Sequence, residues 1–131
     1  MQPLHRLFKA LADSTRLRIL NLLLEEPLCV CELEFILDLP QPLLSRHLAY
    51  LRAAGIVVDK RQGMRVQYSL ASGNELLGIL ESCLKRALSL EETYREDRNR
   101  RDRMRTACCA SSASGTAAVS ETNQCQQGDV Q

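Results

Sequence analysis

The chain has 131 residues, a length that suits one domain with one hydrophobic core. Its net charge is only +1, from 17 Lys and Arg against 16 Asp and Glu, so the overall charge does not by itself indicate a nucleic-acid ligand. Tryptophan is absent, leucine is abundant, and no segment reaches the roughly 18 uninterrupted apolar residues of a membrane span, which favours a mostly helical protein without a membrane partner. Charges interrupt the N-terminal segment too often for a signal peptide, so we expect a cytoplasmic protein whose six cysteines stay reduced.

The first quarter of the sequence predicts two helices. The first covers residues 3–12, and Asp13 is placed to cap a second helix that ends before Pro27. Apolar side chains recur at helical spacing in both segments. The residues expected to face inward are Leu4, Leu7, Phe8 and Leu11 in the first helix and Leu17, Leu20 and Leu24 in the second.

The next segment predicts another pair of helices. Residues 29–37 form a short helix, which the Asp38-Leu39-Pro40 segment breaks. Pro42 suits the first turn of a fourth helix, which stops at Gly55. The residues expected to face inward are Leu33, Ile36 and Leu37 in the shorter helix and Leu44, Leu48 and Leu51 in the longer one.

After Gly55 the apolar pattern changes to a period of two, which predicts a β-hairpin. Gln62-Gly63 is the expected tight turn between its strands. Polar residues alternate with apolar ones in the second strand. The residues expected on its apolar face are Met64, Val66, Tyr68 and Leu70.

A long final helix is predicted next, with Asn74 as its cap. Its apolar face comprises Leu76, Leu80, Cys83, Leu84, Ala87 and Leu90. This face has no obvious intramolecular partner in so small a domain, which predicts a homodimer through the terminal helices. The residues expected at the dimer interface are Leu76, Leu80, Leu84 and Ala87.

Two helices joined by a short turn and followed by a hairpin make a winged helix-turn-helix, whose second helix enters the major groove of DNA. The expected fold class is therefore mainly α with a β-hairpin, and residues 1–93 form the DNA-binding and dimerisation domain. Residues 41–68 carry five basic residues against Asp59, a local net charge of +4. The candidate DNA contacts lie on the fourth helix and the hairpin, and they are Gln41, Ser45, Arg46, His47, Tyr50, Lys60, Arg61 and Arg65.

The C-terminal region differs in composition from the predicted domain. Residues 94–105 are polar all round and predict a charged, solvated helical extension. Residues 106–131 contain no Leu, Ile or aromatic residue, so we expect a disordered tail. That tail nevertheless carries Cys108, Cys109 and Cys125.

Four stretches of the sequence carry a family resemblance: ALADSTRLRILNLL, LCVCEL, QPLLSRHLAYLRAAGIV and RQGMRVQYSL. Over about residues 3–90 the chain resembles the ArsR/SmtB family of metal-sensing repressors, and the phrase around its two cysteines resembles the arsenical resistance operon repressors. The resemblance implies a homodimer that occupies double-stranded operator DNA and leaves it when As(III) or Sb(III) binds as inducer. It also implies that Cys29 and Cys31 are ligands, with no constitutive cofactor.

The cysteine pattern departs from the arsenic-sensing pattern Cys-x-Cys-x-x-Cys, because Glu34 occupies its third position. A carboxylate is a poor ligand for a soft ion such as As(III), which typically takes three thiolates. One alternative is that Cys108 or Cys109 supplies the third thiolate. A second is that Cys29 and Cys31 suffice with a small thiol or water, and a third is that the tail pair forms a separate site. Cys83 is expected in the core, because it lies on the apolar stripe.

A physical link between the cysteines and DNA follows from helix geometry. Residues two apart on a regular helix point to different sides, so Cys29 and Cys31 cannot both grip one small ion while their turn stays helical. We expect the ion to distort the start of the third helix and so misplace the DNA-reading helix that it supports.

Three other readings remain open. A Cd(II), Pb(II) or Zn(II) sensor is one, although no cysteine precedes Cys29 and the only histidines are His5 and His47. A repressor released by thiol oxidation is the second. The third is a thiol enzyme such as an arsenate reductase, but no anion-binding loop precedes either cysteine pair, so we expect no enzymatic activity.

Overall fold

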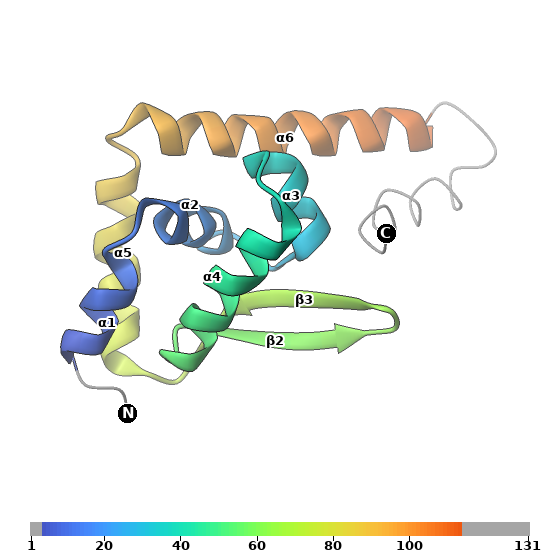
Figure 1. The fold of residues 1–131 in the computed structure, drawn as a ribbon. Coiled ribbons are helices and arrows are strands. Elements are labelled where there is room, and N and C mark those ends of the chain that lie inside the picture. The colour runs from blue at the N-terminus through green and yellow to red at the C-terminus, as the bar shows by residue number, and fades with distance from the viewer. Residues whose placement is uncertain (1–3, 114–131) are drawn as a thin grey trace.

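The computed structural model describes residues 4–113, with side chains described as far as residue 105. Its elements in chain order are α1 (Leu4–Leu11), α2 (Ser14–Leu23), β1 (Leu28–Cys29), α3 (Val30–Leu37), α4 (Gln41–Ala53), β2 (Val57–Gln62), β3 (Arg65–Leu70), α5 (Glu75–Leu88) and α6 (Glu92–Ala113). The expected mainly α fold with a β-hairpin is confirmed (Figure 1). None of the described helices is long and apolar enough to cross a membrane.

The helix-turn-helix pair α3 and α4 is built on local signals that the sequence carries. Asp38 adopts a left-handed conformation at φ 55° and ends α3, while Pro40 caps α4 and Pro42 lies in its first turn. Both expected inward stripes are confirmed, since all six of these side chains are buried: Leu33, Ile36, Leu37, Leu44, Leu48 and Leu51. The pair therefore packs as one unit, with α4 fixed along its buried side.

More side chains of α2 are buried than the sequence predicts. Asp13 caps α2 as expected, and its carboxylate accepts the backbone N–H of Arg16 at 3.1 Å. Leu20 is buried, but Leu17 and Leu24 are only half-buried, while Ile19, Leu22 and Leu23 are buried as well. The single predicted stripe is wrong because α2 is central and contacts α1, α4, β3, α5 and α6.

The helix α1 buries only part of its predicted stripe. Leu7 is buried, but Leu4 and Phe8 are about half exposed. Ala10, which is not on the predicted stripe, is fully buried instead. The reason is that α1 makes most of its contacts with α2, which covers only one side of it.

The hairpin is the predicted wing, and its turn lies one residue later than predicted. β2 and β3 pair from Val57↔Leu70 to Gln62↔Arg65, which leaves Gly63 and Met64 at the turn. Gly63 takes the positive φ of 66° at the first central position, which favours glycine there. Met64 is therefore a turn residue with 81% of its surface exposed, and its predicted place on the apolar face of the strand is wrong.

The structure changes the local setting of Cys29. The predicted third helix begins at Val30 rather than at Cys29, and residues 28 and 29 form the short strand β1. This strand pairs antiparallel with β3, so the sheet order is β1-β3-β2 and Cys29 lies opposite Gln67. Glu32 accepts the backbone N–H of Cys29 at 2.8 Å and so satisfies a donor that precedes the helix. The premise that both cysteines lie on one regular helix is therefore wrong.

The C-terminal helix α6 is not a solvated extension. Figure 1 shows α6 running across α2 and α3, and both helices contact it. Tyr94, Asp97 and Arg101 are buried at 7%, 1% and 4% exposure. The expectation from composition is wrong here because the charges of α6 are paired with groups from elsewhere in the chain. The helix also continues past residue 105 to Ala113, while residues 114–131 of the expected tail, with Cys125, lie outside the described residues.

Charged and polar contacts fasten α6 to α2. Arg18 makes two hydrogen bonds to Asp97, with Nε 2.8 Å from Oδ2 and Nη2 2.9 Å from Oδ1, and this bonding raises the pKa of Arg18. The buried amide of Asn21 donates to the carbonyl of Tyr94 at 3.0 Å. Arg100 donates to the carbonyl of Ile36 at 2.7 Å, which ties α6 to the last turn of α3.

Candidate nucleic-acid interface and cysteine site

The outer face of α4 is open for a ligand. Leu44, Leu48 and Leu51 occupy its buried side, and the opposite side exposes Gln41, Ser45 and Arg46. Gln and Arg side chains can each make paired hydrogen bonds to a base edge in the major groove. The structure therefore brings three of the predicted contacts together on one exposed helix face.

His47 occupies a different setting from these three residues. Only 15% of its side chain is exposed, and its Nδ1 lies 4.0 Å from Oδ1 of Asp13 and 3.5 Å from Nη1 of Arg16. It thus faces the start of α2, where it links the reading helix to the helix behind it. Helical periodicity predicted that His47 lies on the outer surface. That prediction failed because periodicity cannot show that α2 covers this part of α4.

Arg16 is a central residue of this region that the sequence analysis missed. Its Nε donates to the carbonyl of Ala10 at 2.6 Å and its Nη2 to that of Lys9 at 3.3 Å. Its guanidinium also lies over the ring of Tyr50, 4.2 Å from the centroid, in a cation–π contact. Arg16 therefore connects the end of α1, the start of α2 and the reading helix α4.

The electrostatics at this junction favour an ionised Asp13. Burial opposes its negative charge, but the backbone N–H of Arg16 and the positive charges of Arg16 and His47 outweigh that effect and lower its pKa. The ionised carboxylate is the form that caps α2. The cap therefore persists through the neutral pH range.

The wing carries the remaining predicted contacts. Lys60 and Arg61 are exposed on β2, and Arg65 is half-buried on β3. Arg65 donates from Nη1 toward the sulfur of Cys29, at 3.9 Å. The sequence placed Arg65 at the tip of the wing, and the structure additionally places it against Cys29.

The two cysteines lie on either side of the junction between β1 and α3. Cys29 is 3% exposed in the sheet, and Cys31 is half-buried in the first turn of α3. Within the described residues, His, Cys, Asp and Glu form no group of three or more that could hold a metal ion. Cys83 is exposed on α5, so its predicted core position is wrong. Cys108 and Cys109 lie on the helical backbone of α6, beyond the described side chains.

The comparisons with known proteins agree with this architecture. Residues 13–58 match the family of bacterial regulatory proteins called the arsR family. HlyU from Vibrio cholerae N16961, which also has a solved structure of its reduced form, superposes with a TM-score of 0.58 at 39% identity and covers 63% of this chain and 87% of its own. The chain belongs to the ArsR family.

Two curated relatives of this ArsR-family chain are named for arsenic. The arsenic resistance transcriptional regulator ArsR1 of Pseudomonas putida is 56% identical over 64 residues, which are 48% of this chain and 50% of that protein. The arsenical resistance operon repressor of Escherichia coli is 54% identical over 67 residues, 50% of this chain and 57% of that protein. The chain thus spans about half the length of these relatives, and the recognised family and fold class are confirmed.

The family is one of regulatory proteins, in agreement with the expectation that this chain is not an enzyme. The residues expected at the dimer interface lie on α5. Leu76, Leu80 and Leu84 are half-buried, with Leu76 and Leu80 packed against the core of their own domain, and Ala87 is exposed. Ile79, which the sequence analysis did not select, is 62% exposed beside them. The exposed apolar side of α5 therefore includes Ile79 and Cys83, whereas only Ala87 of the four predicted interface residues is exposed.

Proposed function

We propose that this ArsR-family protein is a transcriptional repressor of an arsenic resistance operon, and that As(III) or Sb(III) releases it from double-stranded operator DNA by binding the thiolates of Cys29 and Cys31. The observation that carries the proposal is the position of Cys29. Its backbone pairs with the wing strand β3, and its sulfur lies 3.9 Å from Nη1 of Arg65. Names of relatives that mention arsenic resistance support the choice of inducer.

The coupling uses the junction between β1 and α3. One small ion held by both thiolates must draw Cys29 from the sheet and Cys31 from the first turn of α3 toward a common point. Movement at this junction acts on the wing through β3 and on the reading helix through the α3–α4 contacts. Because DNA binding needs the wing and α4 in fixed positions, the ion and the operator favour different states of the same element.

Arg65 adds an electrostatic part to this coupling. In the absence of the ion its guanidinium lies against the Cys29 sulfur, and it is also a predicted phosphate contact of the wing. When the Cys29 sulfur bonds to As(III), its lone pair is taken up in an uncharged As–S bond, so the favourable contact with Arg65 is weakened. The wing therefore loses the arrangement that suits the DNA backbone.

The third thiolate that we favour comes from Cys108 or Cys109. Arg105 of α6 makes an ion pair with Glu26, which lies three residues before Cys29. Cys108 and Cys109 follow Arg105 within about one helical turn. The Arg105–Glu26 ion pair therefore holds this part of α6 near Cys29 and Cys31. The test separates this proposal from two alternatives. In the first, a small thiol or water is the third ligand, and in the second, Cys108 and Cys109 form a separate site on α6.

The active unit that we propose is a cytoplasmic homodimer joined through α5. Two copies related by a two-fold axis present two α4 helices to half-sites about one DNA turn apart. The proposed DNA contacts of α4 are Gln41, Ser45, Arg46, His47 and Tyr50, with Gln41 and Arg46 as the base readers, and those of the wing are Lys60, Arg61 and Arg65.

The test is fluorescence anisotropy of a labelled fragment of the DNA upstream of the gene, bound by reduced protein and titrated with arsenite. We expect arsenite to release the DNA, and Cys29→Ser and Cys31→Ser to keep DNA binding but abolish the release. Cys125→Ser is the matched control, because it removes a thiol that belongs to none of the proposed ligand sets or interfaces and should respond like the wild type. Tight arsenite binding that leaves operator affinity unchanged would refute the mechanism.

The same assay separates the rival signals. Release by cadmium and not by arsenite would assign the protein to the Cd(II)- or Pb(II)-responsive regulators. Release by diamide without any metalloid would assign it to thiol oxidation, a reading that the solved structure of reduced HlyU makes worth testing. Cys108→Ser and Cys109→Ser, alone and together, then identify the third ligand, with Cys125→Ser as control. If release is unchanged in the double variant, Cys29 and Cys31 are the only protein thiolates that the ion needs.

A further inference from the structure

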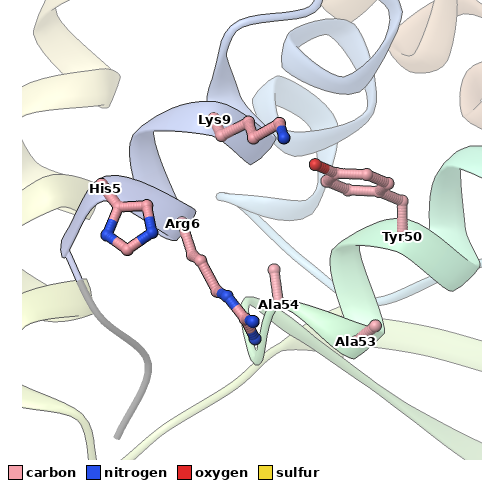
Figure 2. A pocket seen from close by; sticks show the side chains of 6 residues that line it. All are labelled: His5, Arg6, Lys9, Tyr50, Ala53 and Ala54. Carbon is pink, nitrogen blue, oxygen red and sulfur yellow. The ribbon is translucent and has the colours of Figure 1, made fainter.

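A basic pocket lies between α1 and the C-terminal half of the reading helix α4. Its volume is about 390 Å³, and it is lined by His5, Arg6, Lys9, Tyr50, Ala53 and Ala54. Figure 2 shows Arg6 reaching from α1 toward the end of α4, and Lys9 directed toward the hydroxyl of Tyr50. The lining thus combines an imidazole, a guanidinium, an ammonium and a phenol, and it includes no carboxylate.

The cations of this pocket are available for an external anion. Arg6 and Lys9 are exposed on α1, and in the part of the chain that the structure describes no ion pair involves either residue or His5. By contrast, most arginines of α6 pair with carboxylates of their own chain. A cluster of unneutralised positive charge around a donor hydroxyl suits an anion with several acceptor oxygens, such as a phosphate.

The pocket is held against the DNA-reading surface by Arg16. This side chain donates to the carbonyls of Lys9 and Ala10 at the end of α1 and lies over the ring of Tyr50. Tyr50 is four residues after Arg46, so both lie on the same side of α4. The pocket therefore adjoins the exposed face of α4 at its C-terminal half.

We propose that this pocket binds a backbone phosphate of duplex DNA next to the base pairs read by α4, with Arg6 and Lys9 as the charged donors and the Tyr50 hydroxyl as a neutral one. The inference rests on the DNA binding of the proposed function and adds α1 to the interface. Contacts of this kind fix the register of a protein on DNA and carry no sequence information. They contribute through the release of counterions, which makes them measurable by salt.

The test measures anisotropy of the upstream operator and of an unrelated duplex over a range of NaCl concentrations, with full-length wild type, Arg6→Gln and Lys9→Gln. Each substitution should reduce the slope of log K against log [NaCl] by about 0.9 for each subunit on the DNA. Each should also weaken binding to both duplexes by the same factor, because a phosphate contact does not read sequence. Arg103→Gln on α6 is the matched control, an exposed cation away from α4, and should leave the slope unchanged.

The outcomes separate the pocket from the proposed function. Wild type that binds the operator, with slopes that neither substitution changes, overturns the pocket and leaves the repressor proposal intact. Wild type that binds no duplex overturns both. Calorimetric binding of inorganic phosphate that Arg6→Gln abolishes, with unchanged DNA slopes, would assign the pocket to a free anion and also overturn the proposal. Thermal melting of each variant checks that the fold is retained, and arsenite should still release both substituted proteins from DNA.

Discussion

The two C-terminal helices reverse the expectation that composition sets for them. α5 is rich in apolar residues, yet Ile79 is 62% exposed and Cys83 is also exposed. α6 is rich in charges, yet it buries Tyr94, Asp97 and Arg101 against its own domain. The apolar helix α5 is therefore partly exposed, and the charged helix α6 is packed against its own domain.

The difference shows that the position of a helix depends on the partners that its own chain offers. α6 finds donors on α2, a backbone carbonyl on α3 and carboxylates in the segment between α2 and β1. Arg101 lies 2.7 Å from Glu25 of that segment and 3.2 Å from Asp102 of its own helix. Burial lowers the pKa of Arg101, but these hydrogen bonds and charges outweigh it and raise the pKa overall. α5 has no such surface to cover its outer apolar side, which suits a second copy of the chain.

The largest expected effect tests α5. Ile79→Glu should convert a dimer into a monomer, because burying each of the two Ile79 side chains would contribute about 1.5–3 kcal/mol and a buried carboxylate adds a penalty. Sedimentation velocity measures the oligomeric state, and operator affinity should fall with the loss of the second reading helix. Lys85→Glu, at an exposed position on a different side of the same helix, is the matched control and should stay dimeric. A dimer that survives Ile79→Glu would place the interface elsewhere.

An intermediate effect tests the packing of α6. Asp97→Ala leaves the guanidinium of Arg18 without its main partner, and 22% exposure of that side chain offers only partial solvation. We expect a loss of about 2–3 kcal/mol in the free energy of unfolding, at the lower end of the range for broken buried pairs. Urea denaturation at one fixed protein concentration measures it.

The control for this prediction lies on the same helix. Glu92→Ala removes an exposed pair with Arg95, with side chains 77% and 52% exposed, and should change stability by less than about 0.5 kcal/mol. Equal effects of Asp97→Ala and Glu92→Ala would mean that α6 is not fastened through Asp97.

The smallest expected effect concerns the end of α6. Arg105→Gln removes the charge that pairs with Glu26, and the two side chains are 41% and 32% exposed. We expect a loss of under about 1 kcal/mol that shrinks at high salt, since partly exposed pairs are screened. Urea denaturation at low and high NaCl gives both values. A loss that stays the same in high salt would show that Arg105 acts through packing of its aliphatic part instead.

Much of the helix-turn-helix unit could be predicted because its signals are local. Asp13 and Asn74 cap the helices that follow them, and the stripe of Leu44, Leu48 and Leu51 correctly identified the buried side of α4. The alternation after Gly55 correctly predicted the hairpin, with an error of one residue at the turn. The DNA contacts, the inducer ligands and the dimer face stay predictions until they are measured.

The candidate site was only partly predictable, because its key contacts join residues distant in sequence. Nothing near Arg16 in the sequence indicates that it contacts His47 and Tyr50 on another helix. The basic pocket was missed for the same reason, since α1 and α4 bring its lining together. The sequence signal that was overlooked is that the first ten positions contain His5, Arg6 and Lys9 and no acidic residue.

The sequence by itself determined the helix-turn-helix, the hairpin, the buried side of α4 and the family, because caps, turns and periodicity act over a few residues. Only the tertiary structure decided that Cys29 lies in a strand against β3 rather than in α3, and that its sulfur meets Arg65, 36 positions later. It also decided that α6 packs against Glu25, 76 positions away from Arg101. Strand pairing and ion pairing depend on which distant groups the fold brings within a few ångströms, and no local pattern specifies that.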